Sequence, residues 1–227
     1  EMSGAQQAIT EGLRVLRKGG RFSAFGLPDK PVLIDLNNGV IFKGARINYR
    51  EMNETTDRLA AGLASLGVKK GDRVGIFMPN TPQFVMAYFA ILKLGGGVVA
   101  TNPLYSGREI EHQLNDSGIE IMLVMSNFYN TIKEVQPKTK LRKVIVTNLK
   151  EALPPVLGFL FTLTREKKGG FRVTLAEGDL WMQDLIARFK PEDRPKVQVT
   201  SEDVALFQYS GGTTGISKGA IALHRNL

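Results

Sequence analysis

Residues 209–219, which read Tyr-Ser-Gly-Gly-Thr-Thr-Gly-Ile-Ser-Lys-Gly, have the composition of a phosphate-binding loop. Glycine permits positive φ angles and lets backbone N–H groups converge on an anion. The hydroxyls of Ser210, Thr213 and Thr214 can donate further hydrogen bonds, and Lys218 adds a charge suited to the β- and γ-phosphates of ATP. The order differs from the G-x-x-x-x-G-K-[ST] of a Walker A loop, so the stretch does not indicate an ordinary P-loop NTPase.

The apolar run at residues 203–208 predicts a buried strand directly before this loop. A strand followed by a glycine-rich loop is where α/β proteins bind phosphate groups. A flexible linker of Gly, Ser and Thr is the structural alternative. Residues 209–219 resemble the signature phosphate loop of the adenylate-forming superfamily, which comprises acyl-CoA synthetases, luciferases and the adenylation domains of peptide synthetases.

The elements that position the loop alternate between strands and helices from residue 47 onward, and the resemblance to the superfamily continues through residue 227. Such alternation predicts the α/β class, with a largely parallel sheet flanked by helices. The resemblance implies an incomplete N-terminal domain of an acyl-CoA synthetase. We expect strands at 73–78, 98–101, 120–125, 142–147 and 203–208, and helices at 48–66, 82–94, 106–118, 129–135 and 179–189.

Residues 1–46 form a separate unit in this interpretation. A helix ending at Gly19-Gly20 and strands at 21–25, 31–36 and 39–42 predict a short Rossmann-like βαβ remnant. Several short stretches, among them 16–21 and 41–44, resemble threonine dehydrogenase, a medium-chain dehydrogenase, although the G-x-G-x-x-G turn is missing. An unrelated β-α-β start is the alternative. We therefore expect two domains, 1–46 and 47–227, in a chimeric and truncated chain.

Residues 152–163 interrupt the alternation with an apolar segment that precedes the basic residues Lys167 and Lys168. This layout resembles the long-chain fatty-acid members of the superfamily. One hypothesis is a patch that contacts an anionic membrane surface; the other is a helical hairpin packed on the domain.

Composition excludes several classes of protein. The net charge of +8 suits an anionic partner, but no aromatic-plus-basic motif indicates nucleic acid. The chain contains no cysteine, and its histidines, His112 and His224, are too few and too scattered for a zinc site. Neither a membrane span nor a signal peptide is expected, so the predicted location is cytoplasmic, with a peripheral membrane contact left open.

The resemblance implies an ATP-dependent long-chain fatty-acid–CoA ligase, which forms an acyl adenylate and then an acyl-CoA, with ATP, Mg²⁺ and coenzyme A as cofactors or co-substrates. It implies that Lys218 is the catalytic charge partner, and that the cofactor-binding residues are Ser210, Gly211, Gly212, Thr213, Thr214, Gly215 and Lys218. No metal ligand is predicted. Because the adenine-binding and C-terminal parts of the family are missing, we expect this chain alone to be inactive. An NAD-linked threonine dehydrogenase fragment and a lipid-surface interaction module are the alternatives.

Overall fold

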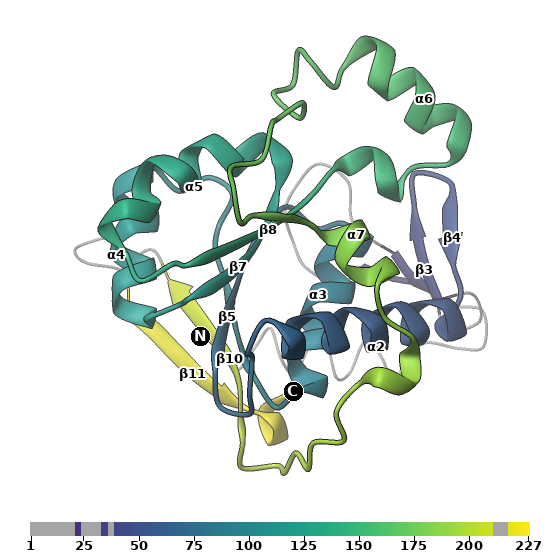
Figure 1. Ribbon diagram of the computed structural model, residues 1–227. Coiled ribbons are helices and arrows are strands. Elements are labelled where there is room, and N and C mark those ends of the chain that lie inside the picture. Colours follow the sequence, from purple (N-terminus) through teal and green to yellow (C-terminus); the bar gives the residue numbers. More distant parts are fainter. Residues whose placement is uncertain (1–20, 24–32, 36–38, 211–217) are drawn as a thin grey trace.

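The computed structural model describes residues 21–23, 33–35, 39–210 and 218–227 (Figure 1). A seven-stranded sheet in the order β11-β10-β6-β5-β7-β8-β9 forms its centre. All neighbouring strands from β10 to β9 pair in parallel, and only β11 is antiparallel to its neighbour. The expected largely parallel α/β sheet is therefore confirmed. The strands are β5 (Arg73–Phe77), β6 (Gly97–Ala100), β7 (Ile121–Met125), β8 (Lys143–Thr147), β9 (Leu180–Trp181), β10 (Val204–Ser210) and β11 (Lys218–Leu223).

Helices cover both faces of this sheet (Figure 1). One face packs against α2, α3 and α7 through a cluster that includes Leu63, Ile91 and Leu185, and the other packs against α4 and α5 through Leu114 and Ile132. The central strands read as continuous apolar runs because a sheet covered on both sides buries every side chain. The helices are α2 (Tyr49–Ser65), α3 (Pro82–Lys93), α4 (Gly107–Ser117), α5 (Tyr129–Val135), α6 (Pro155–Thr164) and α7 (Met182–Ala187).

The helices expected at 48–66 and 106–118 are confirmed, and each begins at a capping side chain. The side chain of Asn48 accepts a hydrogen bond of 2.9 Å from the backbone N–H of Glu51 at the start of α2. Ser106 and Glu109 form a capping box at the start of α4, in which a Glu109 carboxylate oxygen accepts from the Ser106 N–H at 2.7 Å. These caps satisfy backbone donors that a helix leaves without intrahelical partners.

A second, four-stranded sheet contains β1 (Arg21–Ser23), β2 (Leu33–Asp35), β3 (Gly39–Phe42) and β4 (Ala45–Ile47). Each strand pairs antiparallel with the next. The prediction of a Rossmann-like βαβ remnant is therefore wrong for these strands. Parallel pairing needs a crossover of a dozen or more residues, and the connections between these strands are shorter. The predicted helix before residue 20 lies outside the described residues.

The segment at residues 179–189 also differs from its prediction as one helix. Leu180 and Trp181 pair in parallel with Ile145 and Val146, so they extend the sheet as β9, and only Met182–Ala187 is helical. The apolar residues of 179–189 do have helical spacing, but Leu180 and Trp181 form backbone hydrogen bonds with the open edge of β8 instead of a helical turn. No helix among the described residues is both long and apolar enough to span a bilayer.

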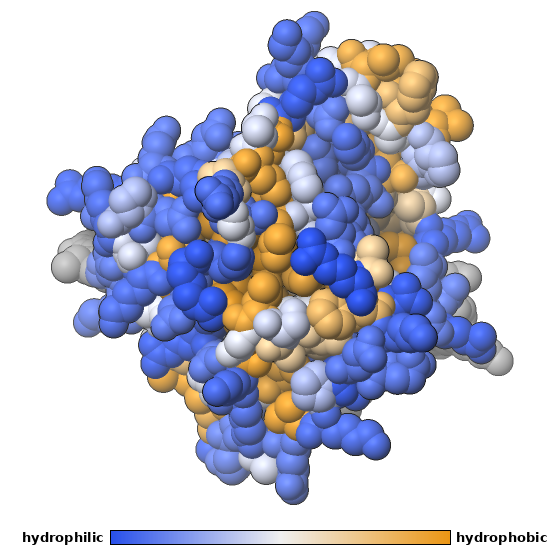
Figure 2. Space-filling model, viewed as in Figure 1, coloured by the Kyte–Doolittle hydropathy of each residue, from blue (hydrophilic) through white to orange (hydrophobic). Residues whose placement is uncertain are grey.

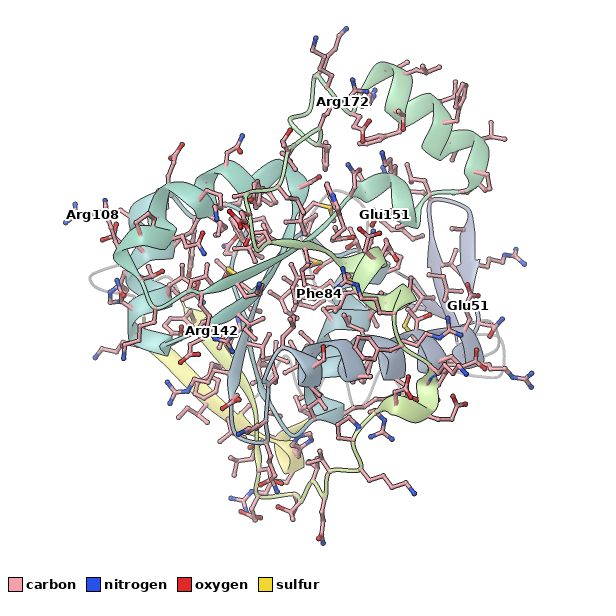
Figure 3. The ribbon with its side chains drawn as sticks, in the orientation of Figure 1. Glu51, Phe84, Arg108, Arg142, Glu151 and Arg172 are labelled. Atoms are coloured by element: carbon pink, nitrogen blue, oxygen red, sulfur yellow. The ribbon has the colours of Figure 1, made fainter. Side chains whose placement is uncertain are left out.

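Helix α6 projects from the body of the molecule (Figure 1), and none of its residues is buried. The loop that carries it is fixed at its base by Glu166, whose side chain is 5% exposed and pairs with Lys150 at 2.8 Å and Arg172 at 3.4 Å. Arg172 lies beside this loop in Figure 3, and Glu151, also labelled there, accepts a hydrogen bond from Gln183 of α7. The loop that carries α6 is thus anchored to the domain, whereas the helix itself is exposed.

Candidate phosphate-binding site

The candidate site lies where β10 ends and β11 begins. Ser210 is the last residue of β10, Lys218 is the first of β11, and their Cα atoms are paired across the hairpin. The structure therefore brings two of the predicted site residues together at the two ends of the loop. Gly211, Gly212, Thr213, Thr214 and Gly215 lie outside the described residues.

Lys218 is exposed and forms no ion pair among the residues that the structure describes. The expected strand before the loop is confirmed, since β10 begins at Val204. The element after the loop is a strand as well, so the described residues present no helix N-terminus to a phosphate.

Tyr209, one residue before the loop end, is 7% exposed and was not singled out as a site residue by its sequence context. Its hydroxyl donates a hydrogen bond of 2.5 Å to a carboxylate oxygen of Asp116, near the end of α4. Burial, followed by this hydrogen bond to Asp116, raises the pKa of Tyr209 above its usual value of 10.0. The phenol is therefore neutral at physiological pH and cannot serve there as a general base.

The carboxyl edge of the parallel sheet carries further hydroxyl groups that the sequence did not reveal. Thr101 directly follows β6, Ser126 directly follows β7, and Thr81 lies between β5 and α3. All three are buried, and within the described residues their hydroxyl oxygens have no hydrogen-bond partner. Ligands of open α/β sheets bind outside this edge, where Ser210 also lies.

An open cleft of about 530 Å³ lies at the opposite end of β11. Its lining includes Phe89, Arg194 and His224, and the backbone N–H of His224 donates to the Asp203 carbonyl at 3.0 Å. His224 begins a short 3-10 helix at His224–Asn226. Lys218 and His224 stand at opposite ends of the six-residue strand β11, about 20 Å apart at the usual rise per residue. The cleft is therefore remote from the candidate phosphate site.

The described residues hold no group of three or more histidine or carboxylate side chains arranged to bind a metal ion.

Comparisons with known proteins agree with this arrangement. The sequence profile of the family described as AMP-binding enzyme matches residues 22–227. A long-chain-fatty-acid–CoA ligase of Salmonella typhimurium is 37% identical over 202 residues, which cover 88% of this chain and 35% of that protein. A ligase of the same name from Bacillus subtilis is 30% identical over 207 residues, 90% of this chain and 36% of its own length.

Among solved structures, the anthranilate CoA ligase AuaEII in complex with anthranoyl-AMP has the same fold, with a TM-score of 0.66 at 22% identity. The match covers 97% of this chain and 35% of that one. The chain thus spans about 35% of the length of the relatives that it matches.

The resemblance of residues 1–46 to threonine dehydrogenase receives no support from these comparisons. The family match begins at residue 22, within that segment. Neither alternative to a ligase fragment, an NAD-linked threonine dehydrogenase fragment or a lipid-surface interaction module, is supported by these comparisons. The domain boundary between residues 46 and 47 stays a prediction.

Proposed function

The chain belongs to the AMP-binding enzyme family, and from this premise we propose that it supplies the ATP phosphate-binding part of a long-chain fatty-acid–CoA ligase. Such a ligase joins a fatty-acid carboxylate to AMP with loss of pyrophosphate and then transfers the acyl group to coenzyme A. In-line displacement at the α-phosphate requires mainly positioning and neutralisation of the departing pyrophosphate.

The observation that carries the proposal is the pairing of Ser210 with Lys218 at the carboxyl edge of the sheet. The backbone positions of Ser210 and Lys218 thereby flank the glycine-rich segment, and the Lys218 side chain is exposed to an incoming anion. We assign Lys218 to the pyrophosphate as its catalytic charge partner. Backbone N–H groups of Gly211, Gly212 and Gly215 and the hydroxyls of Thr213 and Thr214 are assigned to the β- and γ-phosphates.

Thermal unfolding with and without Mg-ATP or pyrophosphate tests this assignment, since a ligand that binds only the native state raises its stability. At a ligand concentration about 100 times Kd the gain is ~2.7 kcal/mol, which shifts Tm by about 5–10 °C for a chain of this length. Lys218→Ala should lose most of the shift. Lys140→Ala, a change at another exposed lysine, is the matched control and should keep it.

The outcome of this experiment is decisive in either direction. A cooperative unfolding transition without any shift in the parent chain contradicts phosphate binding. A shift that Lys218→Ala retains in full leaves phosphate binding in place but removes the role given to Lys218.

A peripheral contact with the membrane surface is a further property that we propose, together with a cytoplasmic location. Helix α6 exposes large apolar side chains, among them Val156 (71%), Phe159 (65%) and Leu163 (66%). The region of α6, at the upper right of the molecule, is largely hydrophobic in Figure 2. The absence of any buried residue in α6 supports this contact over the alternative of a helical hairpin packed on the domain. Exposed lysines at 167 and 168 follow the helix.

An apolar helix next to basic residues is suited to the interface of a bilayer with anionic lipids. Co-sedimentation with phosphatidylcholine vesicles, with and without phosphatidylglycerol and at low and high salt, tests the contact. Phe159→Asp should abolish sedimentation with anionic vesicles. Leu104→Asp changes a side chain that is 81% exposed far from α6 in the sequence, and it should have no effect. No sedimentation of the parent chain at either salt concentration removes the membrane contact.

A further inference from the structure

We propose that Tyr209 is a positioning residue that fixes the hairpin stem carrying the phosphate loop to helix α4. The stem consists of β10 and β11, whose last and first residues are Ser210 and Lys218. The inference rests on the proposed phosphate binding for its functional consequence, but the contacts that carry it lie in the described residues.

The first contact is between Tyr209 and Gly219, which are paired across the two strands. The end of the tyrosine ring occupies the space beside Gly219. A Cβ atom at position 219 would lie 2.9 Å from Cζ and 3.0 Å from Cε2 of the ring. Because real Cβ atoms essentially never approach so closely, only glycine lets the ring lie flat against β11.

The second contact joins the stem to the body of the protein. The Tyr209 hydroxyl donates to Asp116 at 2.5 Å, and the neighbouring residue Ser117 accepts a bond of 2.8 Å from Arg73 of β5 through its carbonyl oxygen. The Arg73 guanidinium in turn lies over the ring of Phe207, 4.7 Å from its centroid. The end of α4 is thus connected to β5 and β10 at the same place.

These contacts matter because β11 is an edge strand of the seven-stranded sheet, and among the described residues it pairs only with β10. Its residue Ile221 is 61% exposed, so little apolar packing holds the strand in place. Tyr209 supplies an anchored side chain across that strand pair. It thereby fixes the relative position of Ser210 and Lys218, on which simultaneous contact with one phosphate group depends.

The test compares two tyrosine-to-phenylalanine variants. Tyr209→Phe removes the hydroxyl bonded to Asp116, whereas Tyr129→Phe removes a hydroxyl bonded to Asp179 at 2.6 Å, between α5 and the start of β9. Each variant loses one hydrogen bond to a carboxylate, and Tyr129→Phe also loses the bond of 2.8 Å that the Tyr129 hydroxyl accepts from the Ala176 N–H, so the control should lose at least as much stability as Tyr209→Phe. Calorimetric titration with Mg-ATP and with pyrophosphate should show about tenfold weaker binding for Tyr209→Phe alone.

Two further variants separate positioning from general destabilisation. Asp116→Asn keeps an oxygen that accepts from the Tyr209 hydroxyl and should bind Mg-ATP within about threefold of the parent chain. Gly219→Ala forces the ring to move and should weaken binding at least as much as Tyr209→Phe. Gly107→Ala, where the nearest atom would be 3.6 Å from the new Cβ, is the glycine control.

Hydrogen exchange without nucleotide tests the stem independently of phosphate binding. The amide protons of β10 and β11 should exchange faster in Tyr209→Phe than in the parent chain and in Tyr129→Phe. If the amide protons of the stem exchange at the same rate in Tyr209→Phe as in the parent chain, the inference is overturned, regardless of the measured affinity for Mg-ATP. Faster exchange of the stem in Tyr209→Phe, together with a parent chain that does not bind Mg-ATP, would refute the proposed function and leave the anchoring role of Tyr209 established.

Discussion

Asp179 provides the sharpest test of the packing between α5 and the sheet. Its side chain is 3% exposed and accepts three hydrogen bonds: from the Tyr129 hydroxyl at 2.6 Å, from the Lys133 ammonium at 2.9 Å and from the Val144 backbone N–H at 3.2 Å. Asp179→Ala leaves the Tyr129 and Val144 donors buried without an acceptor. Each such donor costs about 1–3 kcal/mol, and loss of the Lys133 pair adds to this, so we expect a total loss of about 3–5 kcal/mol.

Urea unfolding monitored by the fluorescence of Trp181 measures this loss, because Trp181 is the only tryptophan and lies on β9 two residues after Asp179. The corresponding decrease in Tm is about 6–20 °C. Asp179→Asn keeps a neutral acceptor and should lose roughly half as much. A loss of less than about 1 kcal/mol for Asp179→Ala would refute the reasoning, since it would mean that water replaces the carboxylate without cost.

The pKa of Tyr129 gives a second readout of the same contact. Burial, followed by the hydrogen bond to Asp179, raises this pKa from 10.0 to about 12. In Asp179→Ala the phenol should ionise at lower pH than in the parent chain, as measured by the ultraviolet absorbance of tyrosinate. An identical alkaline titration in both proteins would show that Asp179 does not influence the phenol.

Three further predictions concern acid stability and packing. Burial opposes ionisation of Glu166, but the hydrogen bonds and charges of Lys150 and Arg172 together outweigh it and lower the Glu166 pKa below its ordinary 4.5. The stabilising effect of Glu166 is therefore complete above pH 4.5 and is lost as the pH falls through the lowered pKa. Urea midpoints measured from neutral to acidic pH should fall less steeply in Glu166→Gln. Gly97→Ala would place a Cβ 2.7 Å from the Phe207 ring and should cost about 1–3 kcal/mol in urea unfolding. Leu63→Ala, at a fully buried position of α2, should cost about 2–5 kcal/mol in the same assay, and a loss below about 1 kcal/mol would contradict the placement of that core.

The parallel sheet could be predicted from the sequence because its signals are local. Apolar runs such as Ile121–Met125 and caps such as Asn48 lie within single elements. The order of the strands depends instead on contacts between residues distant in the sequence, and so does which strand lies at the edge of the sheet. Leu180 and Trp181 form a strand only because β8 offers an open edge, which nothing in residues 179–189 encodes.

The same distinction applies to the candidate site. The glycines, hydroxyls and lysine of residues 209–219 are consecutive, so their composition alone indicates phosphate binding. The partner of Tyr209, Asp116, belongs to a helix that precedes it by several elements, and no sequence pattern links the two. The buried hydroxyls of Thr101 and Ser126 share an edge only through the pairing of their strands.

The position of β10 in the sheet also determines the order in which the protein can assemble. Strands β5, β6, β7 and β8 are joined by single helical crossovers, whereas β10 pairs with β6 by bringing residue 206 against residue 98. Closing the chain between residues 98 and 206 costs conformational entropy, and this cost precedes the favourable pairing of β10 with β6. The hairpin of β10 and β11 is therefore expected to dock late, on a surface that the earlier strands have already built, and the proposed phosphate binding should appear only in the final phase of refolding.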